Sequence, residues 1–197
     1  MFIALEGVDG SGKSTQLALL AEALGPDTLK IREPGGTAAA EAIRSTLADP
    51  GIPLDTTAEL LLFFAARADL VRRVIRPAIE AGRTVVSDRF VDSTEAYQGV
   101  ARGLGVEVVH ELNRIATDGL LPDLTILLRV DPETGLARAE SEDRFEAEGV
   151  AFQRLVAGAY EEIARREPDR FVVVDGSGSP EEVHTRIMAA LGSKARQ

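Results

Sequence analysis

The stretch EGVDGSGKST, residues 6–15, constrains the fold of this chain more than any other feature of the sequence. It fits the pattern G-x-x-x-x-G-K-[ST], with Gly7, Gly12, Lys13 and Ser14 at the defining positions. A loop of this kind surrounds a polyphosphate with backbone N–H groups where a helix begins. A plain glycine-rich turn would explain flexibility but not the Lys13–Ser14 pair. The pattern therefore predicts a buried strand, a phosphate-binding loop and an amphipathic helix, in that order.

The same loop indicates which metal ion to expect. Lys13 adds a mobile positive charge, and the Ser14 hydroxyl is a suitable ligand for Mg²⁺. The chain has no cysteine, which excludes disulfides and thiolate metal sites. Mg²⁺ held by oxygen atoms is therefore the predicted cofactor.

Composition narrows the class of protein. A chain of 197 residues, 45% hydrophobic and 27% charged, predicts one domain spanning residues 1–197. The net charge of −10 argues against a general nucleic-acid surface. We find no apolar run of membrane-spanning length and no signal peptide, so we expect a cytoplasmic protein without a membrane partner.

Short apolar runs alternate with helical runs along the chain. The predicted strands are residues 2–6, 28–32, 84–88, 124–130 and 171–175. The predicted helices are residues 14–24, 38–47, 57–82, 106–119, 132–140, 149–167 and 180–191. This alternation predicts an α/β fold of three layers, a five-stranded parallel sheet flanked by helices. Ligands bind beyond the carboxyl ends of such strands, so the loops after Glu6, Arg32, Asp88 and Asp131 should form the site.

Two of these loops have an open interpretation. The segment REPGGT, residues 32–37, can offer backbone N–H groups to an anion, or it is a plain turn into a helix capped by Thr37. After the third strand, Asp88 can orient a metal-bound water and Arg89 can bridge phosphates. The alternative for that pair is a salt bridge between neighbouring elements.

The long helix and the segment after Arg89 supply candidates for a nucleobase pocket. Phe63 and Arg67 are four residues apart and share a helix face, where they can stack on a flat heterocycle and bond its carbonyl. The alternative is a core phenylalanine with a solvated arginine. The segment DSTEAYQG adds polar side chains at the same rim, or is simply an amphipathic helix start; they are Ser93, Thr94, Tyr97 and Gln98.

The segment AESEDRFEAEG, residues 139–149, is charged and lacks apolar periodicity. It is either a solvated connector or a lid over a nucleotide, with Arg144 or the preceding Arg138 as the arginine that enters the site.

Seven motifs in this order resemble bacterial thymidylate kinase: EGVDGSGKST, REPGGT, FFAAR, SDRF, STEAYQG, LPDLTILLRVDPE and DRFE. The resemblance runs from the first strand to at least the helix after the lid. It implies a P-loop nucleoside monophosphate kinase fold with a short lid at about 138–149. It also implies a cytoplasmic homodimer that uses Mg²⁺ and transfers the γ-phosphoryl group of ATP to dTMP, giving dTDP and ADP.

The resemblance also implies roles for individual residues. The implied catalytic residues are Asp9, Lys13, Arg89 and Arg144. The implied ATP-binding residues are Gly7, Val8, Asp9, Gly10, Ser11, Gly12, Lys13, Ser14 and Thr15. The implied dTMP-binding residues are Asp9, Phe63, Arg67, Arg89, Ser93, Thr94, Tyr97 and Gln98, with Tyr97 crowding the ribose 2′ position. The implied metal-binding residues are Ser14 and Asp88.

The chain departs from the family pattern in two places. The REPGGT loop has no arginine after its proline, so backbone N–H groups or an arginine from elsewhere must bind the dTMP phosphate. The lid is acidic and short, and we choose Arg144 over Arg138 because DRFE matches the lid motif of the family.

Two other functions share the phosphate loop. A GTP-binding switch needs an N-K-x-D motif, but the only asparagine, Asn113, is followed by Arg114. A nucleoside or other small-molecule kinase would lack the dTMP phosphate site.

Overall fold

The computed structural model describes residues 1–138 and 148–194 of the chain. Its sheet contains five parallel strands in the order β2-β3-β1-β4-β5. The strands are β1 (Phe2–Glu6), β2 (Leu29–Arg32), β3 (Val85–Asp88), β4 (Leu124–Arg129) and β5 (Phe171–Asp175). All five predicted strands are confirmed to within one residue at each end.

The helices also follow the predicted order. They are α1 (Lys13–Leu24), α2 (Ala38–Ala48), α3 (Thr56–Leu70), η1 (Val71–Ile75), α4 (Arg76–Glu80), α5 (Val91–Thr94), η2 (Glu95–Ala101), α6 (Val106–Thr117), α7 (Pro132–Arg138), α8 (Gly149–Arg166) and α9 (Pro180–Lys194). The long helix predicted at 57–82 is the continuous run α3-η1-α4, in which η1 is π-helical. A second π-helical segment, η2, extends the short helix α5 beyond the helix start that the sequence indicated.

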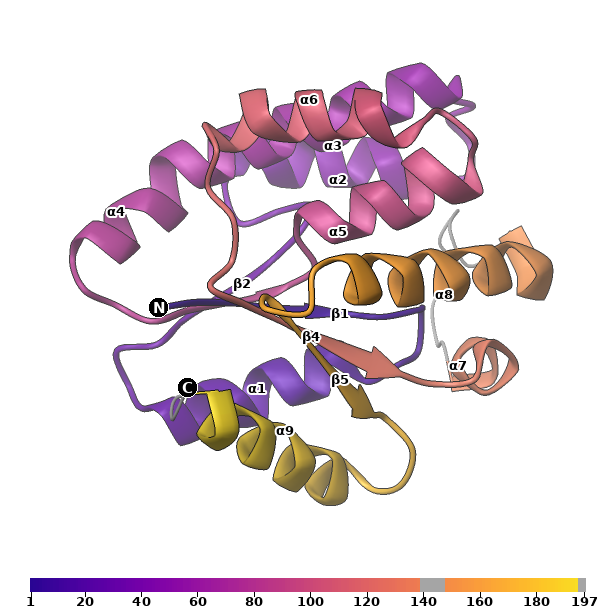
Figure 1. Ribbon diagram of the computed structural model, residues 1–197. Helices are drawn as coiled ribbons and strands as arrows, with labels where there is room; N and C mark the ends of the chain where they lie inside the picture. Colours follow the sequence, from indigo (N-terminus) through magenta and orange to yellow (C-terminus); the bar gives the residue numbers. More distant parts are fainter. Residues whose placement is uncertain (139–147, 195–197) are drawn as a thin grey trace.

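Helices cover both faces of the sheet (Figure 1). Both faces need cover because successive side chains of a strand point to opposite faces, and those of β1 are apolar on both. Ile3 and Leu5 pack with buried residues of α1 and α9 on one face. Phe2 and Ala4 pack on the other face, against the α3-η1-α4 helix and the start of α5. The predicted three-layer α/β architecture is therefore confirmed.

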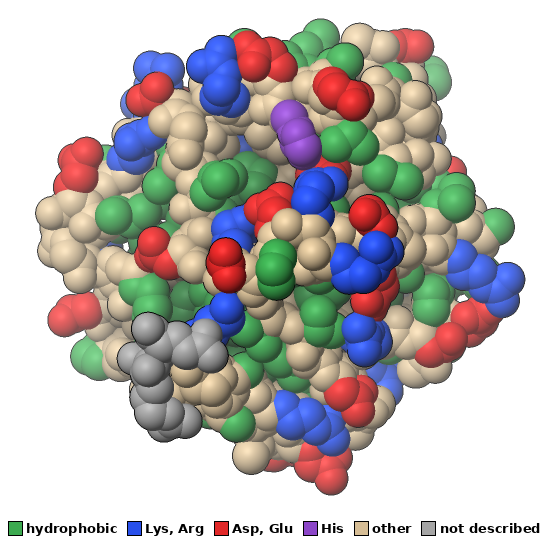
Figure 2. Space-filling view, in the orientation of Figure 1, with side chains coloured by type: hydrophobic (Ala, Val, Ile, Leu, Met, Phe, Trp, Pro, Cys, Tyr) green, Lys and Arg blue, Asp and Glu red, His purple; other side chains and the backbone are tan. Residues whose placement is uncertain are grey.

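The sheet order places β1 between β3 and β4. The register brings the carboxyl ends of β1, β2 and β3 to one edge, since Leu5 and Arg32 both pair with Asp88. In Figure 1, α7 lies beyond the end of β4, on the side of the molecule where α8 begins. Among the described residues, no helix is long and apolar enough to cross a membrane. Basic and acidic side chains are interspersed over the face seen in Figure 2.

Candidate active site

The phosphate-binding loop has the backbone that its glycines predict. Gly7 adopts a φ of 146°, and a Cβ there would lie 2.7 Å from the carbonyl oxygen of Leu128. Gly12, the residue before α1, has a left-handed backbone, and within the described part of the chain no side chain caps that helix. The first N–H groups of α1 therefore face the loop without a side-chain acceptor, as an anion site requires.

Lys13 lies inside the loop that it follows. Its Nζ donates to the carbonyl oxygens of Gly7 at 3.0 Å and Val8 at 2.8 Å, and to Ser11 Oγ at 3.2 Å. Burial, together with the charge of Arg89, lowers the pKa of Lys13 to about 8. The ammonium group thus lies at the centre of the loop, where a phosphate oxygen would compete with these neutral acceptors.

The two predicted metal ligands meet. Ser14, in the first turn of α1, donates from its hydroxyl to Asp88 Oδ2 at the end of β3, at 2.7 Å. Mg²⁺ in phosphoryl-transfer sites is bound by one or two protein oxygens and completes its coordination with phosphate oxygens and water. A neighbouring hydroxyl and carboxylate beside the phosphate loop fit that requirement.

Arg89 and Asp9 form a partly buried ion pair beside the loop. The Arg89 guanidinium also bonds to the Gly7 carbonyl oxygen, Ser93 Oγ and Tyr97 Oη, and it lies 4.9 Å from the centre of the Tyr97 ring. Burial acts to raise the pKa of the Asp9 carboxyl, but the charges of Arg89 and Lys13 outweigh it and hold the pKa below its usual value. The predicted alternative of a salt bridge therefore exists, but it joins Arg89 to Asp9 and not to Asp88.

A cleft of about 280 Å³ joins this loop to the region between α2, α3 and η2. All eight residues predicted to bind dTMP line it, together with both predicted metal ligands and Lys13. Residues that were not predicted to bind ligand also line the cleft: Arg32, Glu33, Pro34, Arg44, Leu47 and Ala48. The structure thus brings the predicted residues together from the phosphate loop, α3 and the segment after β3.

Arg67 lines the cleft, but its side chain is buried and contacts groups of the protein. Its side chain is 2% exposed, so the alternative of a solvated arginine is wrong. Its Nε donates to Glu33 Oε2 at 2.7 Å, and its Nη2 lies 2.6 Å from the same oxygen. The remaining guanidinium N–H groups bond to Thr94 Oγ1, Asn113 Oδ1 and the Phe90 carbonyl oxygen, at 2.7–3.0 Å. Arg67 therefore makes four hydrogen bonds and a further ion-pair contact within the protein.

Helical rotation separates the two neighbouring phenylalanines of α3. Phe64 is buried in a cluster with Leu60 and Val109, whereas Phe63 is half-buried and lines the cleft. The core phenylalanine of the alternative interpretation is thus Phe64. Phe63 has the position that a base-stacking residue needs.

The REPGGT loop has the cap of its plain-turn interpretation, and its anion-binding interpretation stays a prediction, since the Gly36 N–H donates to Glu41 Oε1 at 2.8 Å. Thr37 caps α2 by accepting from the Ala40 N–H at 3.0 Å, as the plain-turn interpretation requires. The same loop contributes Glu33 and Pro34 to the lining of the cleft. Arg44 of α2, seven residues after Thr37, also lines the cleft. It donates to the Pro34 carbonyl oxygen at 3.1 Å. Arg44 thus places a guanidinium beside a loop that has no arginine after its proline.

The structure describes only one of the two candidate lid arginines. Arg138 is the last residue of α7 and is exposed, as the helical continuation of PETGLA indicated. Arg144 lies outside the described residues, as does most of the predicted lid.

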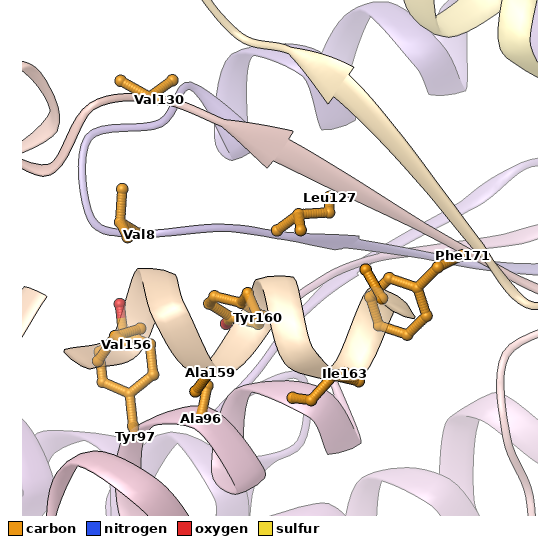
Figure 3. Close-up of a cluster of buried hydrophobic side chains, with 11 residues drawn as sticks. Val8, Ala96, Tyr97, Leu127, Val130, Val156, Ala159, Tyr160, Ile163 and Phe171 are labelled. Atoms are coloured by element: carbon orange, nitrogen blue, oxygen red, sulfur yellow. The ribbon is translucent and has the colours of Figure 1, made fainter. Parts of the chain in front are cut away.

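Two further residues near the site, both of α8, have no sequence signal. Gln153 of α8 donates to Asp9 Oδ2 at 2.6 Å, and Tyr160 of the same helix donates to Glu6 Oε2 at 2.7 Å. These partners are more than 140 residues apart along the chain. Only the docking of α8 over the sheet, seen in Figure 3, brings them together.

A parallel sheet of this order, a phosphate loop between β1 and α1, and an adjoining cleft define a P-loop kinase of the nucleoside monophosphate kinase class. A family model described as thymidylate kinase matches residues 5–187. The chain is 49% identical over 205 residues to a thymidylate kinase of Desulfosudis oleivorans, covering 97% of this chain and 96% of the relative. It is 50% identical over 194 residues to one of Synechococcus sp. strain JA-3-3Ab, covering 97% and 95%.

The fold agrees with these matches. The crystal structure of thymidylate kinase from Ehrlichia chaffeensis superposes with a TM-score of 0.82 at 33% identity, covering 97% of this chain and 98% of that one. The chain belongs to the thymidylate kinase family, whose function is the phosphorylation of dTMP to dTDP with ATP. Family membership decides against the GTP-binding switch and the nucleoside kinase.

Proposed function

We propose that this protein transfers the γ-phosphoryl group of ATP to dTMP, and that the cleft described above holds both substrates. The observation that carries the proposal is the continuity of the cleft, which runs from Lys13 in the phosphate loop to Phe63 on α3. A nucleotide phosphate at one end and a flat base at the other fit that arrangement.

The loop backbone and Lys13 bind the ATP phosphates. Lys13 Nζ exchanges its neutral carbonyl acceptors for phosphate oxygens, which form stronger, charge-assisted bonds. Ser14 and Asp88 would hold Mg²⁺ by oxygen ligation. The ion, when bound, neutralises charge on the donor phosphates.

At the other end of the cleft, Phe63 stacks on thymine and the ring of Tyr97 restricts the space at the ribose 2′ position. Ser93, Thr94 and Gln98 line the same region. A bond from Arg67 to a thymine carbonyl would compete with its present contacts, since the guanidinium already makes four hydrogen bonds and an ion pair within the protein.

Arg44 binds the dTMP phosphate in our proposal. It lines the cleft from α2, beside the REPGGT loop, and its guanidinium matches a phosphate in geometry. Arg44→Ala should raise the KM for dTMP at least tenfold, by loss of a charge-assisted bond of about 1.5–3 kcal/mol, and change the KM for ATP much less. Arg73→Ala, an exposed arginine of η1 that does not line the cleft, is the control. Equal changes in both KM values would place the dTMP phosphate elsewhere.

Arg89 connects the two ends and bridges the phosphates of donor and acceptor. Asp9 fixes its guanidinium by the partly buried ion pair. In-line transfer spreads charge over the equatorial oxygens, which a bidentate guanidinium stabilises most in the transition state.

A lid arginine completes the charge stabilisation, and we retain Arg144 for that role, with residues 138–149 as the lid. Arg144→Ala should lower kcat about a hundredfold or more with little change in the KM for dTMP. Arg138→Ala, at the end of α7, should keep most of the wild-type kcat. The reverse result would reassign the catalytic role to Arg138.

We further propose a cytoplasmic homodimer. Residues 60–77 are largely apolar and form a candidate contact surface. Half of their apolar side chains are buried in the core of the protein, but Leu61 of α3 remains 52% exposed. On α6, which packs against α3, Val108 and Ile115 are 51% and 57% exposed. Sedimentation that shows a monomer at micromolar concentration would remove this proposal.

The phosphate-loop assignment is tested by Lys13→Ala with Lys30→Ala as the matched control. Lys30 is an exposed residue of β2. Lys13→Ala should remain folded and lose nearly all dTMP phosphorylation, because its charge faces the transferred group. A kcat for Lys13→Ala equal to that of Lys30→Ala would refute the assignment.

A further inference from the structure

A fully buried carboxylate lies next to the phosphate loop. Glu6, the last residue of β1, is 0% exposed and is not among the described residues that line the cleft. It accepts from the Phe90 N–H at 2.7 Å, from Ser93 Oγ at 2.6 Å and from Tyr160 Oη at 2.7 Å. Burying a carboxylate costs free energy unless hydrogen bonds compensate for the lost water. All three donors to Glu6 come from outside β1.

The direction of these bonds can be worked out by counting protons. Ser93 and Tyr160 have one hydroxyl proton each, and their oxygens are 2.9 Å apart. Both lie closer to Glu6 Oε2 than to one another, so both protons point at Glu6. The Ser93 oxygen then offers its lone pairs to the Arg89 Nη1 proton at 3.2 Å.

Glu6 also fixes the backbone beside Arg89. Arg89 has a left-handed φ of 70°, which is uncommon for a residue with a side chain. Its N–H donates to the Leu5 carbonyl oxygen, and the N–H of the next residue, Phe90, donates to Glu6 Oε1. Two neighbouring residues at the end of β1 thus accept from two consecutive N–H groups of the unusual turn.

The geometry points to Glu6 as a positioning residue for phosphoryl transfer, which aligns the Arg89 guanidinium through Ser93 and the Phe90 N–H. This inference rests on the proposed role of Arg89. Tyr160 fastens the same carboxylate to α8, and it lies between the sheet and η2 in Figure 3. The carboxylate at the end of β1 is the common acceptor for the turn after β3, for α5 and for α8.

The alignment is strongest with an ionised Glu6, because protonation adds a donor to the carboxyl and weakens it as the acceptor of the three hydrogen bonds. Charged and titratable groups face it from each packed element: Asp92 of α5, Tyr160 of α8, Arg89 from the turn and Lys13 of α1. Burial, with the nearby Asp92 charge, raises the pKa of Glu6 to about 7. The positioning network is therefore fully formed above neutral pH.

Glu6→Gln tests the inference while keeping the shape of the side chain. A glutamine has one acceptor oxygen, so at least one of the three bonds is lost or reversed. We expect kcat for dTMP phosphorylation to fall about tenfold, with the KM values for ATP and dTMP within about twofold of wild type. The wild-type kcat should decline below about pH 7, and this limb should be absent from Glu6→Gln. The midpoint of thermal unfolding at pH 8 should not fall.

Glu95→Gln is the matched control. Glu95 of η2 is also buried and accepts from His110 and Arg166, on a side of η2 that does not line the cleft. It should keep kcat within about twofold of wild type. An equal loss in both variants would show that any buried Glu→Gln change slows this enzyme, which would overturn the inference.

The route through Arg89 is tested in an Arg89→Lys background. Lysine cannot form the same bidentate contacts, so Arg89→Lys should be slow, and adding Glu6→Gln should slow it by less than about twofold. A further tenfold loss would mean that Glu6 acts independently of Arg89. If Arg89→Lys keeps the wild-type kcat, the proposed role of Arg89 fails and the inference fails with it.

A normal kcat in Glu6→Gln, beside a slow Arg89→Lys, would refute the inference alone. Should Glu6→Gln not fold, Tyr160→Phe removes only the hydroxyl that binds Glu6. It should lower kcat about threefold at unchanged KM, and a wild-type kcat in that variant would also refute the inference.

Discussion

Replacing Arg67 by alanine should lower the free energy of unfolding. Its effect on substrate binding would therefore be measured in a destabilised protein. Arg67 and Glu33 form an ion pair in which the two side chains are 1% and 4% exposed. Removing the guanidinium leaves the Glu33 carboxylate buried without its counter-ion. The substitution also leaves Asn113 Oδ1 and the Phe90 carbonyl oxygen without the donor that binds them now.

The magnitude follows from this environment. Breaking a buried ion pair by removing one partner costs about 3–5 kcal/mol, because the remaining charge is uncompensated. For a domain of this size, each kcal/mol lowers the midpoint of thermal unfolding by about 2–4 °C. Arg67→Ala should therefore unfold roughly 6–20 °C below the wild type.

Urea unfolding followed by circular dichroism at pH 8 measures the free energy directly. Arg73→Ala is the control, since that side chain is 73% exposed and its pair with Asp69 is of the weak surface kind. The control should lose less than about 0.5 kcal/mol. In the double variant Arg67→Met/Glu33→Gln, which removes both charges, part of the loss should be recovered. A loss below 1 kcal/mol in Arg67→Ala would refute the reasoning and indicate that water reaches this pair.

Three further predictions concern the cleft and its buried carboxylate. Phe63→Ala should raise the KM for dTMP much more than the KM for ATP in a coupled ADP assay, and equal effects would count against stacking. Tyr97→Ala should improve the use of the ribonucleotide analogue relative to dTMP, and an unchanged ratio of kcat/KM values would show that Tyr97 does not discriminate the sugars. Because the pKa of Glu6 is raised in the folded state from 4.5 to about 7, its contribution to stability is fully present below 4.5 and is lost as the pH rises through 7. The free energy of unfolding of wild type relative to Glu6→Gln should accordingly fall by on the order of 3 kcal/mol between pH 4.5 and 8, and an unchanged difference would show that Glu6 does not titrate in this range.

Local patterns were sufficient to predict the sheet and the position of the site. The phosphate loop depends on residues adjacent in sequence, so spacing alone predicts Gly7, Lys13 and Ser14 at the end of β1. The meeting of Ser14 and Asp88 follows from a simple rule, since the carboxyl ends of the parallel strands β1 and β3 lie at the same edge of the sheet.

Burial and long-range partners were not predictable in this way. A four-residue spacing shows that Phe63 and Arg67 share a face, but it does not show that Asn113 and Glu33 would surround Arg67. The contact of Tyr160 with Glu6 spans 154 residues and depends on how α8 docks over the sheet. No local signal encodes that docking.

The π-helical segment η2 is a related case. Its residues, Glu95–Ala101, read as the start of an ordinary amphipathic helix. The wider turn places Tyr97 and Gln98 in the lining of the cleft, and such turns are frequent at functional sites. Helical periodicity with 3.6 residues per turn does not reveal it.

Phosphorylation of dTMP and of thymidine, measured side by side with the purified protein, ATP and Mg²⁺, tests the central claim most directly. We predict that dTMP yields dTDP and ADP in equal amounts, with a kcat/KM at least a thousandfold above that for thymidine, because only dTMP presents a phosphate to Arg44 and Arg89. Phosphorylation of thymidine as efficient as that of dTMP, or release of ADP without dTDP, would contradict the account.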